Sequence, residues 1–148
     1  MDNAIRTKIL KVLDKHRLMT VATNRPDGWP QATTVGYVND GLTLYFVCSL
    51  KSQKAYNLSR DSRISLTIDD DVSDPTAITG LSMAAHAFLV SDAAEQAKAM
   101  RLLGERYPEY TKFLMPKPED IRIYRVKPKV ISVLDYSKVL GHVKLVTI

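Results

Sequence analysis

The chain has 148 residues, of which 45% are hydrophobic and 25% are charged. These values are typical of a globular protein with its own core, and they predict a single domain over residues 1–148. No apolar run reaches the ~18 residues of a membrane span, and the N-terminus lacks the apolar stretch of a secretory signal, so a cytoplasmic location is expected. The formal charge of +5 suits an anionic partner, but the cations are spread along the chain.

Few residues offer metal or nucleophile chemistry. Cys48 is the single cysteine, which excludes an internal disulfide and a thiolate metal cluster. His16, His86 and His142 are scattered along the chain, and the acidic run at 69–74 lacks the spaced ligands of a calcium loop. The sequence therefore predicts no metal site. Nucleic-acid binding is not expected either, because no stacking motif accompanies the basic residues.

The first half of the chain predicts a short amphipathic helix followed by strands. Asp2 or Asn3 can cap the helix, in which Ile5 and Ile9 recur at helical spacing. Three β-prone runs follow at residues 18–23, 31–38 and 42–48. Turns rich in Gly, Pro, Asn and Asp separate them, so we expect an antiparallel meander. A short helix then ends near Arg60.

The second half predicts further strands and one long helix. Residues 63–68 and 76–90 have strand patterns and flank the solvated run "DDDVSDP". Asp92 and Glu95 resemble a capping box that opens the helix "AAEQAKAMRLLGERY". Residues 121–127 and 130–136 predict two more strands, which Pro128 interrupts. About six strands joined by hairpins favour a mainly β fold, a small antiparallel barrel with the long helix over one opening.

Polar side chains gather where the third strand ends and a helix begins. Ser49, Ser52, Gln53 and Lys54 offer hydroxyl, amide and ammonium donors there, beside the free N–H groups of a helix N-terminus. Such a set matches a phosphate dianion. The alternative is that Ser52 only caps the helix while the lysines face solvent.

The order of these segments is similar to that of the pyridoxamine 5′-phosphate oxidase-like split-barrel family. The resemblance lies in "VAT...PDGWPQATTV", "YFVCSLKSQKAYNLSRDSRISL" and "YRVKPKVISVLDYS". It implies a six-stranded antiparallel split β-barrel of Greek-key type with peripheral helices. It also implies a homodimer that holds flavin mononucleotide (FMN) at the subunit interface.

The resemblance also assigns site residues. The phosphate contacts match Ser52, Gln53 and Lys54. The flavin ring and ribityl chain match two strands, with residues Val47, Cys48, Ser49, Gln31, Thr33, Thr34 and Val35. Gln53 and Gln31 stand where many relatives carry basic residues. In the C-terminal tail, the resemblance places Tyr136, Lys138, Gly141 and His142 beside the cofactor or the partner subunit.

Several functions follow from the resemblance. The first is an FMN-dependent oxidoreductase acting on a small molecule, because a flavin carries the redox chemistry itself. Vitamin B6 oxidation is not expected, since the tail lacks the Arg-x-His pattern of those oxidases. The alternatives are a non-catalytic flavin-binding or stress-response protein, and a relative that binds F420 or haem. Trp29, in the first hairpin, is expected in the core or against the flavin or partner.

Overall fold

The computed structural model describes residues 1–112 and 116–148 and is mainly β. Three helices occur in these residues: α1 (Asn3–Lys15), α2 (Gln53–Arg60) and α3 (Ala93–Arg106). The strands are β1 (Leu18–Asn24), β2 (Pro30–Gly36), β3 (Val38–Asp40), β4 (Thr43–Ser49), β5 (Arg63–Asp69), β6 (Thr79–Leu89), β7 (Ile121–Asp135) and β8 (Val143–Thr147). Short 3-10 turns lie at Pro75–Ala77, Pro108–Lys112 and Pro118–Asp120.

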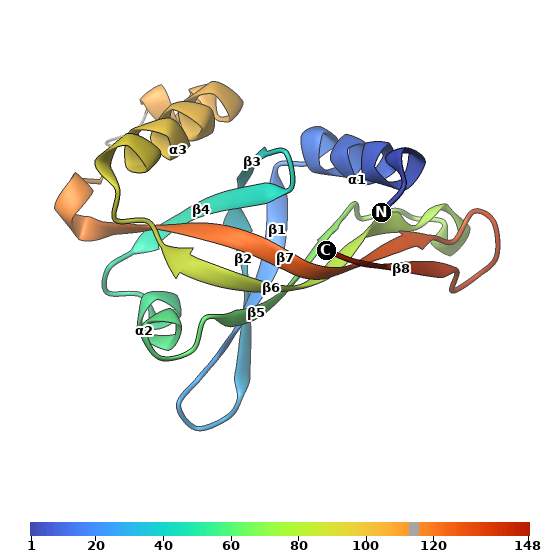
Figure 1. The fold of residues 1–148 in the computed structure, drawn as a ribbon, viewed down its shortest axis with the longest axis horizontal. Helices are drawn as coiled ribbons and strands as arrows, with labels where there is room; N and C mark the ends of the chain where they lie inside the picture. The colour runs from blue at the N-terminus through green and yellow to red at the C-terminus, as the bar shows by residue number, and fades with distance from the viewer. Residues whose placement is uncertain (113–115) are drawn as a thin grey trace.

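The strands form one curled antiparallel sheet in the order β2-β1-β5-β6-β7-β4-β3, and β8 pairs with β7 (Figure 1). This confirms the predicted split-barrel fold. The strand count differs from the expected six, because the run at 31–38 divides into β2 and β3 and the tail adds β8. The division falls at Tyr37, which is fully buried and whose hydroxyl donates to Leu13 O at 2.7 Å.

The expected meander forms only in part. β1 pairs with β2 and β3 pairs with β4, but β2 and the β3–β4 hairpin lie at opposite ends of the strand order. The curl of the sheet brings β2 and β4 into contact without a hydrogen-bonded ladder between them in the described residues. We call this line of contact the β2–β4 seam; it is the split of the barrel.

Pro128 does not end a strand, contrary to the prediction. β7 runs without a break from Ile121 to Asp135, and its register against β6 shifts between Ala84 and Ala85. Ala84 pairs with Val130 and Ala85 with Pro128, so Lys129 is an extra residue on β7. A bulge of this kind removes the need for a ladder hydrogen bond from proline, which has no N–H.

Two apolar clusters hold the elements together. The larger lies inside the curled sheet, and α1 contributes Ile5, Ile9 and Leu13 to it. α3 instead packs on the outer face, where Ala99 and Leu103 join a second cluster. The long helix, which was predicted over one opening of the barrel, therefore packs on the outer face instead, and α1 packs against the core. No helix in the described part of the chain is long and apolar enough to cross a membrane.

Candidate cofactor site

The polar turn lies between the end of β4 and the start of α2. Ser52 is the N-cap of α2: its Oγ accepts from the Ala55 N–H at 3.1 Å and donates to Ser49 O at 2.7 Å. Ser49 is exposed, and its Oγ accepts from the Lys51 N–H. The capping role that the sequence left open for Ser52 is therefore present, and its hydroxyl already has partners.

The first N–H groups of α2 are open donors. The backbone N–H groups of Gln53 and Lys54 donate no hydrogen bond to any acceptor among the described residues. An α-helix leaves its first N–H groups unpaired and carries a partial positive charge at this end. The N-terminus of α2 can therefore donate to an anion through these two groups.

Lys54 adds a full charge at the same place. Its Nζ donates to Thr33 Oγ1 at 2.7 Å and so links α2 to β2 across the β2–β4 seam. No carboxylate of the described residues is within ion-pair distance of this half-buried ammonium group. Lys54 therefore holds an uncompensated positive charge beside the open N–H groups.

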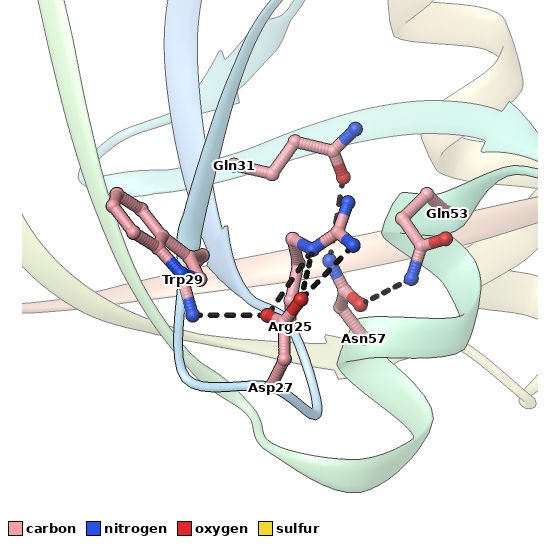
Figure 2. Close-up of polar contacts among 6 residues, drawn as sticks. All are labelled: Arg25, Asp27, Trp29, Gln31, Gln53 and Asn57. Atoms are coloured by element: carbon pink, nitrogen blue, oxygen red, sulfur yellow. Dashed lines mark hydrogen bonds and ion pairs between the residues drawn. The ribbon is translucent and has the colours of Figure 1, made fainter.

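A buried asparagine connects α2 to β1 and β2. Asn57 is fully buried in α2, and its Nδ2 donates to Thr23 Oγ1 at 2.9 Å and to Gln31 Oε1 at 3.4 Å. Its Oδ1 accepts from Gln53 Nε2 at 2.8 Å. Figure 2 shows Gln31 and Gln53 on either side of Asn57. These bonds fix α2 against β1 and β2 and turn the Gln53 amide toward Asn57.

The strand alternation divides the predicted site residues into two faces. On β2, Gln31, Thr33 and Val35 are half-buried on the face toward α2, whereas Thr34 is exposed on the other face. On β4, Cys48 packs against the main core and Val47 against the outer cluster. The structure thus brings Gln31, Thr33, Gln53 and Lys54 together, and it turns Thr34 and Val47 away from them.

The sequence matches a known protein family over most of its length. Residues 5–135 match the family model described as pyridoxamine 5′-phosphate oxidase. The chain belongs to this family. No protein of curated function matches the chain.

Several solved structures with different names share this fold. A haem-binding protein from Mycobacterium smegmatis superposes with a TM-score of 0.82 at 19% identity, over 99% of this chain and 59% of that one. HutZ, a haem storage protein from Vibrio cholerae, gives 0.70 at 21% identity, over 82% of this chain and 88% of that one. General stress protein 26 from Bacillus anthracis gives 0.73 at 13% identity, over 97% and 98%. The chain thus spans 59% of the length of the mycobacterial protein, and these likenesses show the fold.

In this member of the pyridoxamine 5′-phosphate oxidase family, the charges of two cations act on Cys48. Burial raises the pKa of the Cys48 thiol above its ordinary 9.0, while the nearby Ser52 hydroxyl and the charges of Lys54 and Arg122 act in the opposite direction. Arg122 stands directly across from Cys48 in the β4–β7 register. Burial also raises the pKa of Tyr124, on the same strand, to about 12. Burial thus favours the neutral thiol, and the two positive charges oppose this effect.

The β1–β2 hairpin presents Trp29 to solvent. Arg25 pairs with Asp27 at 3.1 Å, and Asp27 Oδ1 accepts from the Trp29 N–H at 3.1 Å (Figure 2). Gly28, with φ of 88°, closes the turn through a hydrogen bond to Arg25 O. Trp29 is 73% exposed, so its expected place in the core is wrong.

Sequence reasoning missed Asn57, Thr23 and Arg122. The i, i+4 spacing of Gln53 and Asn57 was a usable signal for a side-chain pair on one helix face. Thr23 and Arg122 become part of the site only through strand register, which the sequence alone does not give. No group of three His, Cys, Asp or Glu in the described residues could hold a metal ion. Tyr136, Lys138, Gly141 and His142 lie at the β7–β8 connection.

Proposed function

We propose that this chain binds FMN at the β2–β4 seam and acts as a flavin-dependent oxidoreductase on a small molecule. The proposal rests on two features that lie together. The Lys54 ammonium group has no carboxylate partner in the described residues, and the backbone N–H groups of Gln53 and Lys54 are open donors. Together they suit a phosphate dianion.

The residues present fit the phosphate end of FMN with a particular division of roles. Lys54 and the two backbone N–H groups hold the phosphate, since the hydroxyl of Ser52 caps the helix and the amide of Gln53 bonds Asn57. Gln31, Thr33 and Cys48 lie along the seam toward which the rest of the cofactor would extend. Bound FMN would supply the electron transfer, and these residues position it.

A homodimer with the cofactor at the subunit interface is part of the proposal. Flavin at the seam would lie at the edge of the curled sheet, where a second subunit could cover it. A cytoplasmic location is also part of the proposal.

Haem binding is the second candidate function. It is favoured by the structural likeness to the haem-binding protein of M. smegmatis and to the haem storage protein HutZ. The likeness to general stress protein 26 favours a stress-response role instead. F420 is a further candidate ligand. Its phosphate would bind at the position proposed for the FMN phosphate.

The test is an absorbance spectrum of the purified protein before and after mixing with FMN, followed by gel filtration. We expect a flavin band that co-elutes with a dimer. A protein that retains no flavin contradicts the proposal, and a Soret band or the deazaflavin spectrum favours haem or F420 instead. Sustained turnover of an added reductant with an added acceptor by the flavin-bound sample then separates an enzyme from a flavin carrier.

A further inference from the structure

A cavity lies between α3 and the start of β7, where Ile121 pairs with Ser49 at the end of β4. Its volume is about 740 Å³, within the range of small-molecule sites. α3 forms one wall with Ala93, Ala97 and Met100, and Ile121 and Ile123 of β7 form another. Figure 1 shows α3 standing beside the segment that leads into β7. The cavity is a groove rather than a closed void.

The walls of this groove are largely apolar. Leu89 and Val90, at the end of β6, continue the apolar surface of β7, and Leu89 is 51% exposed. The polar side chain of Gln96 is turned aside, because its Nε2 donates to Val90 O at 3.1 Å. An apolar ligand would therefore remove hydrocarbon surface from water here without leaving buried polar groups unpaired.

Arg122 is the one charged residue among the described residues that line the groove. Its guanidinium group donates to Ile121 O at 3.1 Å, and no described carboxylate pairs with it. Arg125, three residues further along β7, differs in this respect, since its Nη1 lies 2.7 Å from Glu95 Oε2. The groove thus combines apolar walls with one cation that lacks an anionic partner in the described residues.

We propose that this groove binds an apolar monocarboxylate. The carboxylate pairs with the Arg122 guanidinium, whose forked N–H groups match two carboxylate oxygens, and the hydrocarbon part lies against α3 and β7. A single unpaired cation selects a single negative charge, and the absence of described lysines or further arginines from the lining disfavours phosphates. The lining of the groove does not include Lys54, but its Arg122 stands across from Cys48 on β4, so the binding is tested in the flavin-free protein.

The test is calorimetric titration of the flavin-free protein with octanoate and with octanol, which share a chain length and differ in charge. We expect octanoate to bind at least about tenfold more tightly, as charge-assisted hydrogen bonds allow. Arg122→Gln removes the charge and keeps a polar side chain, so it should abolish this preference. Arg101→Gln is the matched control, because Arg101 lies on α3 and pairs with Glu105 outside the groove.

A second variant tests the location independently of charge. Ala97→Trp places a large side chain on the groove wall of α3 and should reduce the binding of both ligands, while far-UV circular dichroism checks that the fold is intact. Equal affinities for octanoate and octanol, or an unchanged preference in Arg122→Gln, would overturn the proposal. Amide shifts in NMR spectra that fall outside α3 and residues 116–123 would also overturn it.

Discussion

The Nζ of Lys54 lies 2.7 Å from the Oγ1 of Thr33, so a cation at the start of α2 is held across the β2–β4 seam by a strand that is distant in sequence. The bond gives the ammonium group a fixed position. Thr33 also faces the same side as Gln31, which bonds Asn57 of α2. Two separate contacts therefore join α2 to β2.

Lys54→Ala should weaken FMN binding. The change removes a charge-assisted contact to the phosphate, expected to be worth about 1.5–3 kcal/mol, or roughly 10- to 150-fold in Kd. Flavin fluorescence titration at constant salt measures it. Lys51→Ala is the control, because Lys51 is an exposed lysine in the same turn and removes the same formal charge. Similar Kd values for the Lys54 and Lys51 variants would argue against a phosphate at Lys54.

Asn57→Ala should destabilise the fold. Asn57 is fully buried, and the change leaves Thr23 Oγ1 and Gln53 Nε2 without their partner, with Thr23 itself only 1% exposed. Loss of buried hydrogen bonds of this kind costs about 1–3 kcal/mol in the free energy of unfolding. Urea unfolding, monitored by circular dichroism, measures the change.

A double-mutant cycle with Thr23→Val separates the bond from the packing. If Asn57 and Thr23 act as a pair, the two destabilisations should add to more than that of the double variant, with a coupling energy of about 0.5–3 kcal/mol. Strict additivity would mean that the bond contributes nothing beyond each side chain's own burial.

The sequence could predict those parts of the fold that rest on local pattern. Asp2 caps α1, Ser52 caps α2 and Asp92 caps α3, each through a short-range bond to the third residue on. Glu95 shows the limit of such reasoning. The expected capping box would turn its carboxylate back to the helix start, but Glu95 instead pairs with Arg125 and accepts from the Tyr45 hydroxyl at 3.1 Å. A tertiary ion pair overrides the local motif.

Strand neighbours and faces depend on long-range pairing, which one sequence does not supply. Tyr45 and Phe46 are neighbours on β4, and both are buried, Phe46 in the main core and Tyr45 in the outer cluster. Polar and apolar residues do not alternate here, so the sequence pattern does not tell which face is the inner one or that the outer face is covered. The same gap hid the role of α3, which covers Tyr45. It also hid Arg122, whose place beside Cys48 follows from the β4–β7 register. The polar turn was predictable because all its residues are adjacent in sequence.

The stability of the protein should fall in acid through Asp135. A hydrogen bond from Lys8 Nζ at 2.6 Å, with a further one from Ser137, lowers the pKa of Asp135 from 3.8 to about 2. Because the folded-state pKa is the lower one, this stabilisation is fully present above about pH 4 and is lost as the pH falls toward 2. Urea unfolding midpoints between pH 7 and the acid range measure it.

Lys8→Met should flatten this acid response, since the Asp135 pKa would move back toward its ordinary value. Lys11→Met is the control: Lys11 lies on the same helix, is exposed, and has no ion pair among the described residues. An acid response in Lys8→Met as steep as that of the unmodified protein would show that other carboxylates determine it.

Cys48 should react slowly with a disulfide reagent such as DTNB. The thiolate is the reacting form, and burial raises the pKa of Cys48 above 9.0, so at pH 7.5 the folded protein should react more slowly than the urea-unfolded chain. The charge of Lys54 lowers this pKa, so Lys54→Ala should slow the reaction further, whereas Lys51→Ala should leave the rate unchanged. A faster reaction in Lys54→Ala would mean that loss of the Thr33 contact opens the seam, and that Lys54 protects the thiol by position rather than activating it by charge.

If FMN lies along the seam as proposed, saturating FMN should protect Cys48 in the unmodified protein and protect it less at the same FMN concentration in Lys54→Ala, which ties the thiol and the phosphate contact to one site.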